Sequence, residues 1–265
     1  MIAAPTAART KGAYTVPILA KAIALIKTVA TGNDPPTIKA LEVNLGLAHS
    51  TCYRIVQTLV DEEWLRPLPG GRFALSAGLL PLLEPLAGYK LLIDLVRSRM
   101  ANLSAETGLL VKLSVRQGNF ANTLFRVESP LPASVSTRVG ASFHLAYGSS
   151  GAILLSELPE RQRAAIVATA PPECWQYQTP ADLAARLAEF KRTGACSDLG
   201  HFHPNYHAVS AALRGRGGHV VAAVTIVGFP QAIKSAIVPD LKKALLRCTA
   251  ALQHTLKESN YRADA

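Results

Sequence analysis

The sequence lacks several features that define large classes of proteins. It contains no run of about 18 or more apolar residues, which argues against a membrane span, and we expect no membrane partner. Its four cysteines are scattered and form no CxxC pair, which argues against a disulfide framework or a zinc ribbon. The first ten residues, MIAAPTAART, lack the basic start and apolar core of a secretion signal. These absences predict a reduced, cytoplasmic protein.

Charged residues are also scarce. Only 17% of the residues are charged and 49% are hydrophobic, so the chain can bury a sizeable core. A length of 265 residues favours two domains over one. The 28 Lys and Arg residues outnumber the 18 Asp and Glu residues, for a net charge of +10 and a pI of about 9.7. This excess permits an anionic partner such as nucleic acid, but it is spread along the chain and indicates no particular domain.

The N-terminal part of the sequence predicts three helices followed by a hairpin. Apolar residues recur at helical spacing over Val16–Thr31. Thr37 can cap a short helix, IKALEVNL, that ends at Gly46, and a third helix is expected from about residue 49 to Glu63. The stretch WLRPLPGGRFAL is typical of two short strands joined by a Pro/Gly turn. This order of elements indicates a winged helix-turn-helix.

The rest of the sequence predicts a linker followed by a mixed domain. Residues 76–107 are mostly helical in pattern, with a long helix over Tyr89–Thr107. LLVKLSV and FANTLFRV flank RQGN like one hairpin, NYHAVSAAL and HVVAAVTIVG flank RGRGG like another, and ASVSTRVG is a further strand candidate. Helices are expected over Phe143–Leu158, Ala181–Thr193 and Pro239–Glu258. We therefore expect an α+β fold for this second domain.

The third predicted helix has a polar face suited to DNA. Apolar residues at positions i, i+3, i+4 and i+7 from Cys52 form its core stripe, and no carboxylate occurs from Val43 to Val60. Backbone N–H groups and hydroxyls at an acid-free helix end can hold phosphate oxygens, while Arg and Gln side chains reach base edges. An ordinary amphipathic helix with a solvated polar face is the alternative. The DNA-binding candidates, including two wing arginines, are Thr37, His49, Ser50, Thr51, Tyr53, Arg54, Gln57, Arg66 and Arg72.

The segment TIKALEVNLGLAHSTCYRIVQTLVDEEWLRPLPGGRFALSAGLL resembles the DNA-binding domain of IclR-type transcriptional regulators. In that family a Gly-Leu-x-x-Ser-Thr-x-x-Arg pattern opens the recognition helix. The matching residues here are Gly46, Leu47, Ser50, Thr51 and Arg54. The family usually places Lys or Arg where His49 stands, so the resemblance implies a weaker or pH-sensitive DNA contact at that position. The resemblance covers about residues 14–255.

The resemblance also implies a GAF-like effector domain, an antiparallel sheet flanked by helices. VGASFHLAYGSSGAILLSELP is similar to a family stretch in which Gly140, His144 and Ala152 fit, while Ser150 or Gly151 replaces the usual Lys. The expected division of the chain is a disordered tail over residues 1–13, a winged helix-turn-helix domain over 14–75, a linker helix over 76–90, an effector-binding domain over 91–258 and a tail over 259–265.

The resemblance further implies a small-molecule pocket formed by the segment after Gly194 and by the last strand. The family's acidic residue falls on Asp198, and its other pocket positions, often Cys or Ser, fall on Ala208, Thr225 and Val227. The polar side chains are thus kept at Asp198 and Thr225 and lost at Ala208 and Val227. A drier, more aromatic pocket favours a larger effector, such as an aromatic or heteroaromatic carboxylate. The effector-binding candidates are His144, Asp198, His201, His203, Tyr206, His207, Ala208, Thr225 and Val227.

The histidine-rich stretch LGHFHPNYHAVS keeps other readings open. Asp198, His201, His203 and His207 supply nitrogen and oxygen ligands in a short span, so a metal- or small-molecule-binding enzyme is the alternative function. Pro204 interrupts any regular element there, and we expect no metal or cofactor. Solvated or core histidines are a further possibility.

A serine hydrolase is a weaker alternative. YGSSGA does not match G-x-S-x-G, because Ala152 occupies the last position. A set of Ser150, His201 and Asp198 can be imagined, but nothing in the sequence sets its geometry.

The sequence thus predicts a ligand-responsive transcriptional regulator, activator or repressor, and not an enzyme. One helix-turn-helix reads one half-site, so a near-palindromic operator requires a homodimer or a homotetramer. We expect effector binding to shift the geometry between the DNA-reading domains through the helices of Ser76–Thr107.

Overall fold

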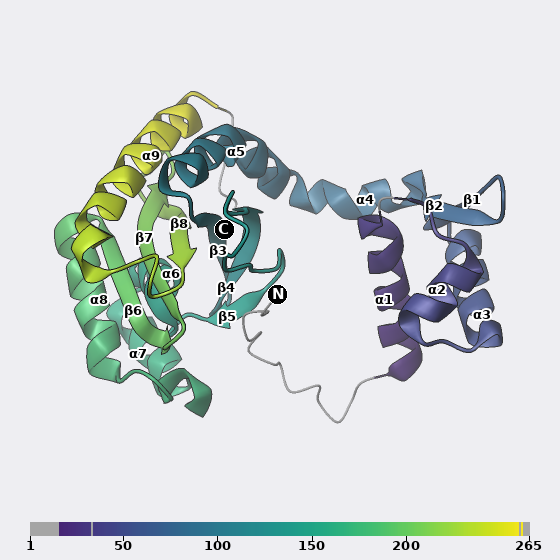
Figure 1. Ribbon diagram of the computed structural model, residues 1–265, viewed down its shortest axis with the longest axis horizontal. Coiled ribbons are helices and arrows are strands. Elements are labelled where there is room, and N and C mark those ends of the chain that lie inside the picture. The colour runs from purple at the N-terminus through teal and green to yellow at the C-terminus, as the bar shows by residue number, and fades with distance from the viewer. Residues whose placement is uncertain (1–15, 33, 260, 262–265) are drawn as a thin grey trace. The chain divides into compact units, whose positions relative to one another are not determined.

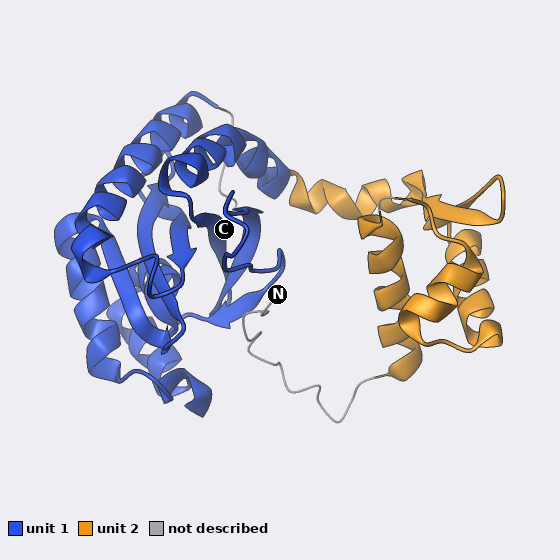
Figure 2. Ribbon diagram, in the orientation of Figure 1, with its two compact units in different colours: residues 1–7, 88–265 blue, residues 8–87 orange. Residues whose placement is uncertain are grey.

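A computed structural model describes residues 16–32, 34–259 and 261. The chain divides into two compact units, whose described parts are residues 16–87 and residues 88–259 with Tyr261 (Figure 2). The N-terminal tail expected over residues 1–13 lies outside the described residues. Of the C-terminal tail expected over residues 259–265, Ser259 and Tyr261 are described, and Tyr261 is buried in the core of its unit.

The first unit is a three-helix domain with a hairpin (Figure 1). Thr37 caps the second helix by accepting a hydrogen bond from the Ala40 N–H, and Gly46 ends that helix at φ 61°, a conformation that favours glycine. The helices enclose a small apolar core around Leu25, Leu41 and Val56. The elements are α1 (Pro17–Thr31), α2 (Ile38–Leu45), α3 (His49–Asp61), β1 (Leu65–Leu68) and β2 (Arg72–Leu75).

A chain of short helical pieces follows the hairpin and leads into one long helix. Pro81 and Pro85 stand in the first turns of two of these pieces, where a missing N–H costs no helical hydrogen bond. The pieces are a 3-10 turn (Ala77–Leu79), α4 (Leu80–Leu83), a second 3-10 turn (Glu84–Leu86) and α5 (Ala87–Thr107). None of the helices in the described part of the chain is both long enough and apolar enough to cross a membrane.

The second unit is built on a six-stranded sheet with the strand order β5-β4-β3-β8-β7-β6. Every neighbouring pair in it is antiparallel. Two predicted hairpins form its centre, because β3 pairs with β4, β7 pairs with β8, and β3 and β8 join them. The strands are β3 (Leu110–Gln117), β4 (Phe120–Val127), β5 (Ser142–His144), β6 (Ala195–His203), β7 (Tyr206–Arg214) and β8 (Val220–Gly228).

The two faces of this sheet carry different helices. One face, with Val111, Val209 and Ile226, packs on α5 and on α9 (Val238–Glu258). The opposite face packs on α6 (Gly148–Ser156) and α8 (Pro180–Thr193), which lie on the other side of the sheet in Figure 1. A shorter helix, α7 (Glu160–Ala168), and 3-10 turns at Pro172–Trp175 and Ser235–Ile237 complete the unit. This α+β architecture agrees with the predicted fold class.

Three local predictions were wrong. ASVSTRVG, residues 133–140, forms no strand. The helix expected over Phe143–Leu158 begins only at Gly148, because residues 142–144 pair with β4 as the edge strand β5. The histidine-rich stretch does contain regular elements, the end of β6 and the start of β7, which are separated by a turn at residues 204–205; the pairing of the two strands is irregular between Leu199 and His203. Pro204 lies in the turn after β6, where it breaks no sheet hydrogen bond.

Close packing at the start of α6 generates the first prediction. A Cβ atom built on Gly151 would lie 2.4 Å from the backbone oxygen of Leu145, a distance that backbone atoms cannot relieve cheaply. We expect Gly151→Ala to lower the free energy of unfolding of the second unit by about 1–3 kcal/mol in urea denaturation, through overpacking. The matched control is Gly88→Ala in α5, where a Cβ meets nothing within 4 Å and should stabilise the helix. Equal stability of the two variants would contradict the packing.

Candidate functional site

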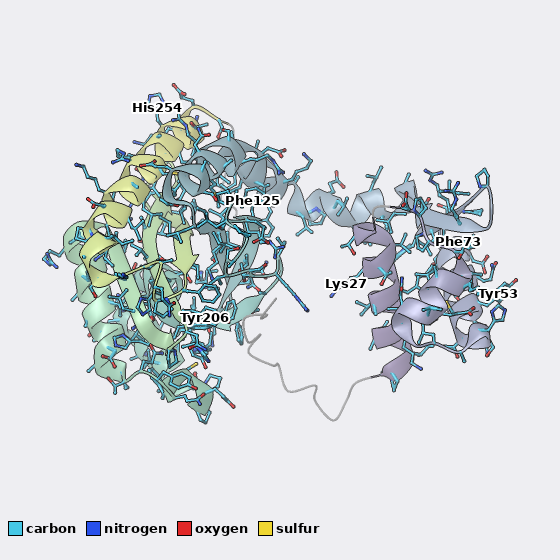
Figure 3. The ribbon with its side chains drawn as sticks, in the orientation of Figure 1. Lys27, Tyr53, Phe73, Phe125, Tyr206 and His254 are labelled. Atoms are coloured by element: carbon cyan, nitrogen blue, oxygen red, sulfur yellow. The ribbon has the colours of Figure 1, made fainter. Side chains whose placement is uncertain are left out.

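α3 separates its apolar and polar residues onto two faces. Cys52, Ile55, Val56 and Leu59 are buried, as the spacing predicted. Around them, Ser50, Tyr53 and Arg54 are exposed and Thr51 and Gln57 are half-buried, and Figure 3 shows Tyr53 on this helix. The structure therefore gathers the predicted DNA-contacting side chains of the helix on the surface that its core does not use.

His49 begins α3 beside a carboxylate from the preceding helix. Its Nδ1 lies 2.6 Å from Oε1 of Glu42, and its ring stacks near the Tyr53 ring with centroids 6.3 Å apart. The acid-free interval of the sequence starts one residue after Glu42. The carboxylate of Glu42 therefore lies at the start of the helix that carries the predicted DNA contacts.

Some of the remaining DNA-binding candidates already form hydrogen bonds within the protein, and others do not. The Thr37 hydroxyl serves as a helix cap, and Arg72 Nε donates to the Pro69 carbonyl at 3.2 Å in the hairpin turn. Arg66 is exposed on the other strand of the hairpin. Neither Arg54 nor Arg66 forms an ion pair with any described residue, so both guanidinium groups are available to phosphate.

The second unit contains a cavity of about 60 Å³ between one face of its sheet and the start of α6. Five of the nine predicted effector residues line it, namely Asp198, Tyr206, Ala208, Thr225 and Val227. The other lining residues are Lys112, Val135, Ser136, Thr137, Phe143, Tyr147, Gly148, Ser149, Ser150 and Phe202. The cavity is mostly apolar with a few polar groups, which is typical of a small-molecule site.

A row of three buried hydroxyl groups lies beside the cavity, and its two outer members, Ser149 and Thr225, line the cavity. Ser149 Oγ lies 2.7 Å from Ser210 Oγ, which in turn lies 2.8 Å from Thr225 Oγ1. All three residues are at most 1% exposed. Ser210 and Thr225 are register partners on β7 and β8, while Ser149 stands in the first turn of α6. The row therefore links the sheet to the helix that covers it.

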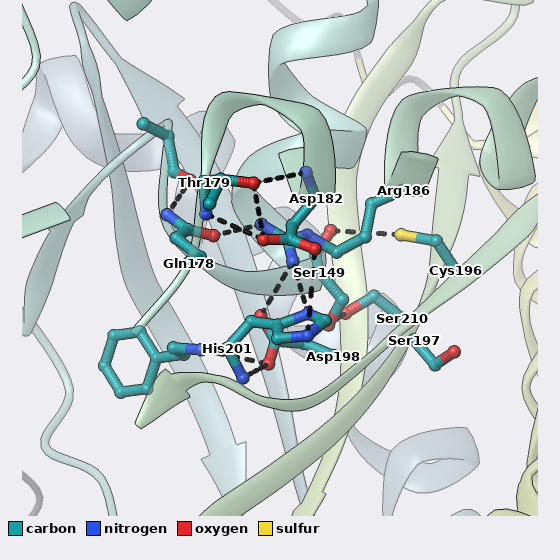
Figure 4. A network of polar contacts seen from close by, with 12 residues as sticks. Ser149, Gln178, Thr179, Asp182, Arg186, Cys196, Ser197, Asp198, His201 and Ser210 are labelled. Carbon is teal, nitrogen blue, oxygen red and sulfur yellow. Dashed lines mark hydrogen bonds and ion pairs between the residues drawn. The ribbon is translucent and has the colours of Figure 1, made fainter. Parts of the chain in front are cut away.

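Asp198 is fully buried and half satisfied (Figure 4). Its Oδ1 accepts hydrogen bonds from the backbone N–H groups of His201 and Phe202, at 2.8 Å and 3.0 Å. Its Oδ2 lies 3.5 Å from Nη1 of the buried Arg186 but has no hydrogen-bond donor among the described residues. Arg186 itself donates to the Gln178 side chain. One carboxylate oxygen at the cavity is thus charge-balanced yet unpaired.

Lys112 brings an amine to the same cavity from β3. Its Nζ lies 5.1 Å from the centre of the Phe143 ring and forms no hydrogen bond or ion pair with the described residues. Burial lowers the pKa of the Lys112 ammonium to about 8. The Lys112 ammonium therefore loses its proton at a lower pH than the ammonium of an exposed lysine does.

Aromatic rings form the wall of the cavity. The Phe202 ring meets the edges of Phe143 and Tyr147, with centroids 5.4 Å and 5.1 Å apart. Burial raises the pKa of Tyr147, so its hydroxyl stays neutral. Tyr206 lies at the start of β7 and stacks toward Phe229 at 6.4 Å (Figure 3).

The structure places none of the four histidines among the effector candidates in the cavity lining. His144 is buried, its Nδ1 accepts from the Ala146 N–H at 3.2 Å, and burial lowers the pKa of its imidazole. His207 Nδ1 lies 2.7 Å from the carbonyl oxygen of Ile233 and donates a hydrogen bond to it, because a carbonyl oxygen can only accept. Both rings support the fold around the cavity.

His201 and His203 lie at the end of β6 and make other contacts. Arg186 Nη1 lies 3.2 Å from His201 Nδ1, which accepts in this contact, and His201 Nε2 is 3.9 Å from the Asp182 carboxylate (Figure 4). His203 lies between the rings of Tyr177 and Tyr206, at 5.3 Å from each. His201 thus contributes to the ion network behind Asp198.

The alternative chemistries find no support in this geometry. Among the described residues, no group of three or more His, Cys, Asp or Glu side chains is arranged to hold a metal ion. Ser150 forms no hydrogen bond with a histidine in the described part of the chain, and His201 engages Arg186 instead. Gly151 is required for close packing, as shown above.

A helix-turn-helix unit, joined by helices to a separate sheet unit with a mostly apolar cavity, defines a transcriptional regulator with an effector-binding domain. Comparison with protein families makes the assignment specific. Residues 18–69 match the IclR helix-turn-helix domain, and residues 90–254 match the C-terminal domain of the bacterial transcriptional regulator IclR. The chain belongs to the IclR family of DNA-binding transcriptional regulators.

Known relatives match most of the length of this chain at low sequence identity. The HTH-type transcriptional regulator RhmR of Escherichia coli is 26% identical over 80% of this chain and 83% of its own. TtgV of Pseudomonas putida, also an HTH-type transcriptional regulator, is 23% identical over 94% and 95%. The crystal structure of Thermotoga maritima IclR has a TM-score of 0.67 at 16% identity, covering 91% of this chain and 99% of that one. An IclR homologue from Microbacterium hydrocarbonoxydans complexed with 4-hydroxybenzoate also has a TM-score of 0.67, at 21% identity and coverages of 91% and 100%.

Sequence reasoning missed several residues that line the cavity. Lys112 is the only charged residue in the otherwise apolar and hydroxyl-bearing stretch LLVKLSV, and this isolation was the signal that could have found it. Phe143, Tyr147 and Ser149 were expected to belong to one helix, and a helical pattern does not predict that all three line the same cavity. Residues 135–137 carried no recognisable signal.

The buried amine of Lys112 generates the second prediction. In the unfolded chain its pKa is about 10.5 and in the folded protein about 8, so between these values the unfolded state binds more protons. Below pH 8 the folded state bears the full cost of a buried charge. We expect Lys112→Met to exceed the wild type in free energy of unfolding near neutral pH by about 1–3 kcal/mol. We expect the difference to shrink as pH rises from 8 toward 10.5.

Urea denaturation of both proteins at a series of pH values measures this difference. Asp198, Tyr147 and Tyr206 are the other ionisable side chains that line the cavity, and they are present in both proteins. Lys191→Met, on the exposed surface of α8, is the matched control and should show no such trend. A difference that does not change with pH would show that the Lys112 ammonium is hydrated and keeps its ordinary pKa.

Proposed function

We propose that this protein is a ligand-responsive regulator that binds a near-palindromic operator as a homodimer or a dimer of dimers in the cytoplasm. The single observation that carries the proposal is the exposed polar face of α3, which has no carboxylate from His49 to Val60, within an IclR-type helix-turn-helix. Such a face can enter the major groove without repelling phosphate. Its second unit senses a small organic acid.

The proposed DNA contacts divide into two kinds. Ser50 and Thr51, at the start of α3, are suited to phosphate oxygens, and Arg54 and Gln57 to phosphate or base edges. Tyr53, His49 and Thr37 flank this set. Arg66 and Arg72, in the hairpin, would contact the adjacent backbone as a wing.

The proposed effector is a carboxylate that carries an aromatic ring. The rings of Phe143, Tyr147 and Phe202 offer a flat apolar wall, and Thr225 offers a hydroxyl. The homologue complexed with 4-hydroxybenzoate supports this class of ligand. The chain runs from the hairpin through the 3-10 turns, α4 and α5 directly into β3, which carries Lys112. We propose that effector binding changes operator affinity through this continuous segment.

Replacement of Arg54 tests the DNA-reading face. Because Arg54 is exposed and forms no ion pair with described residues, Arg54→Ala should leave the fold intact. We expect operator affinity to fall roughly 10- to 100-fold, as for loss of a specific base or phosphate contact. Fluorescence anisotropy on DNA from upstream of the protein's own coding sequence, with random DNA as competitor at two salt concentrations, measures it.

The matched control for this experiment is Arg161→Ala, an exposed arginine on α7 in the other unit. This variant should bind the operator like the wild type. Unchanged affinity of Arg54→Ala would overturn the recognition-helix assignment. Binding by the wild type that random DNA removes easily would show that only net charge is at work, and would overturn the proposed function.

A substitution on the exposed apolar surface of the first unit tests the proposed dimer. On α1, Ile18, Leu19 and Ile23 are 51%, 58% and 46% exposed. A stripe of this kind on a small unit is typical of a buried contact, and a second copy is the partner that a palindromic operator requires. We expect Leu19→Glu to weaken self-association at least tenfold in analytical ultracentrifugation. Lys21→Glu, on the same helix, is the control, and equal association of both variants would contradict this surface.

A further inference from the structure

We propose that His201 is a proton-operated switch that decides which side chain binds Arg186. When His201 is neutral, its ring accepts a hydrogen bond from Arg186. When His201 takes up a proton, it releases the guanidinium group to Asp198 and pairs with Asp182 instead. This inference goes beyond the proposed function, because it gives the second unit a response to pH that needs no ligand.

The contact between Arg186 and His201 determines which ring nitrogen carries the proton (Figure 4). Arg186 Nη1 lies 3.2 Å from His201 Nδ1. A guanidinium group stays protonated and can only donate, so Nδ1 is the accepting nitrogen of a neutral ring and the ring proton is on Nε2. A second proton, on Nδ1, would place two donors of like charge face to face and break this contact.

Asp198 is the partner that Arg186 would gain. Its Oδ2 lies 3.5 Å from the same Nη1 atom, is buried, and has no hydrogen-bond donor among the described residues. The other terminal nitrogen of Arg186, Nη2, donates to the Gln178 side chain. A small rotation about this anchor can therefore carry Nη1 from His201 toward Oδ2. The hydrogen bond gained there recovers the free energy that an unpaired buried acceptor costs.

Asp182 is the partner that protonated His201 would gain. Its Oδ1 lies 3.9 Å from His201 Nε2, which is within reach of an ion pair but too far for a hydrogen bond. Its Oδ2 accepts hydrogen bonds from the hydroxyl and the backbone N–H of Thr179, at the start of α8. These hydrogen bonds lower the pKa of the Asp182 carboxyl, so Asp182 stays an anion in the pH range where histidines take up protons.

The charges around His201 favour the added proton. Asp182 and Asp198 carry two negative charges and Arg186 carries one positive charge, so protonation of His201 makes this cluster neutral. The His201 side chain is 45% exposed, so protons reach it from solvent. Other ionisable residues on the elements beside it form no hydrogen bond or ion pair with His201 in the described part of the chain; they include His203 on β6, Tyr206 and His207 on β7, Glu189 on α8, and Glu173 and Tyr177 before α8.

The switch reaches the cavity through the chain next to His201. Asp198 Oδ1 accepts hydrogen bonds from the backbone N–H groups of His201 and Phe202, and both Asp198 and Phe202 line the cavity. His201 itself is not in the cavity lining. A change in the partner of Arg186 therefore alters the charge distribution at one wall of the cavity from outside it.

Nuclear magnetic resonance of the full-length protein, with histidine and arginine selectively labelled with ¹⁵N, tests the proposal between about pH 8 and pH 5. At the upper pH, His201 should show the ring signals of a bare Nδ1 and a protonated Nε2. As the pH falls, the guanidinium signals of Arg186 should shift with the same midpoint as the ring signals of His201. Asp182→Asn, which keeps an acceptor for the helix cap, should move that midpoint to lower pH by up to about one unit, because the ion pair is lost.

His201→Asn is the decisive variant, because the Asn carbonyl can replace Nδ1 as the acceptor but takes up no proton. In this variant the Arg186 signals should not change with pH over the same range. The matched control is His203→Asn, on the same strand, where His203 Nδ1 accepts from the Asn205 N–H. This control should keep the pH response of Arg186 that the wild type shows.

Four results would overturn the switch. They are an Arg186 response that persists in His201→Asn, Arg186 signals that stay fixed while the wild-type His201 ring titrates, a neutral His201 ring with its proton on Nδ1, and a ring that takes up no proton down to about pH 5. None of these results depends on operator binding, so the switch and the proposed regulator are tested separately.

Discussion

Asp198 and Arg186 bring opposite charges from β6 and α8 into a region where water is almost excluded, at 1% and 3% exposure. Two such charges are stable there only because each also has hydrogen-bond partners, from the Gln178 side chain and from the chain following Asp198. Gln178 in turn donates to the backbone at Ala146 and Cys174. The start of α6, the start of α8 and the end of β6 are thereby held together. Asp198, at the centre of this network, also lines the cavity, so the network fixes part of the cavity wall.

One face of the sheet packs in the apolar core, and the opposite face lines the candidate ligand cavity. Alternate residues of β3, β7 and β8 pack on α5 and α9 as an apolar core, and this pattern of alternation is what a strand dictates. The intervening residues carry Lys112, Ser210 and Thr225 toward the other face. Polar groups there can be changed with little effect on the core, so a regulator of this design can acquire a new ligand without losing its fold.

Local patterns in the sequence predicted much of this structure. α2 has the bounds of the predicted helix IKALEVNL, because a capping threonine and a left-handed glycine define them locally. The alternation of apolar residues likewise predicted both central hairpins. β5 and the extension of β6 as far as His203 could not be predicted, since a three-residue edge strand has no periodicity and Pro204 stands just beyond the strand that it was expected to interrupt. Lys112 was missed because its neighbours in space lie on distant strands, whereas the histidines stood out only because they are close in sequence.

The O–H bonds in the row formed by Ser149, Ser210 and Thr225 can be oriented in either of two directions. Each hydroxyl owns a single proton, so a row of three can point its O–H bonds from helix to sheet or from sheet to helix, with all members turning together. A ligand that accepts a hydrogen bond from the Thr225 hydroxyl favours one direction of the O–H bonds along the row. A ligand that donates a hydrogen bond to Thr225 favours the other direction. The orientation of the Ser149 hydroxyl, in the first turn of α6, would then depend on the group that meets Thr225, two hydroxyls away.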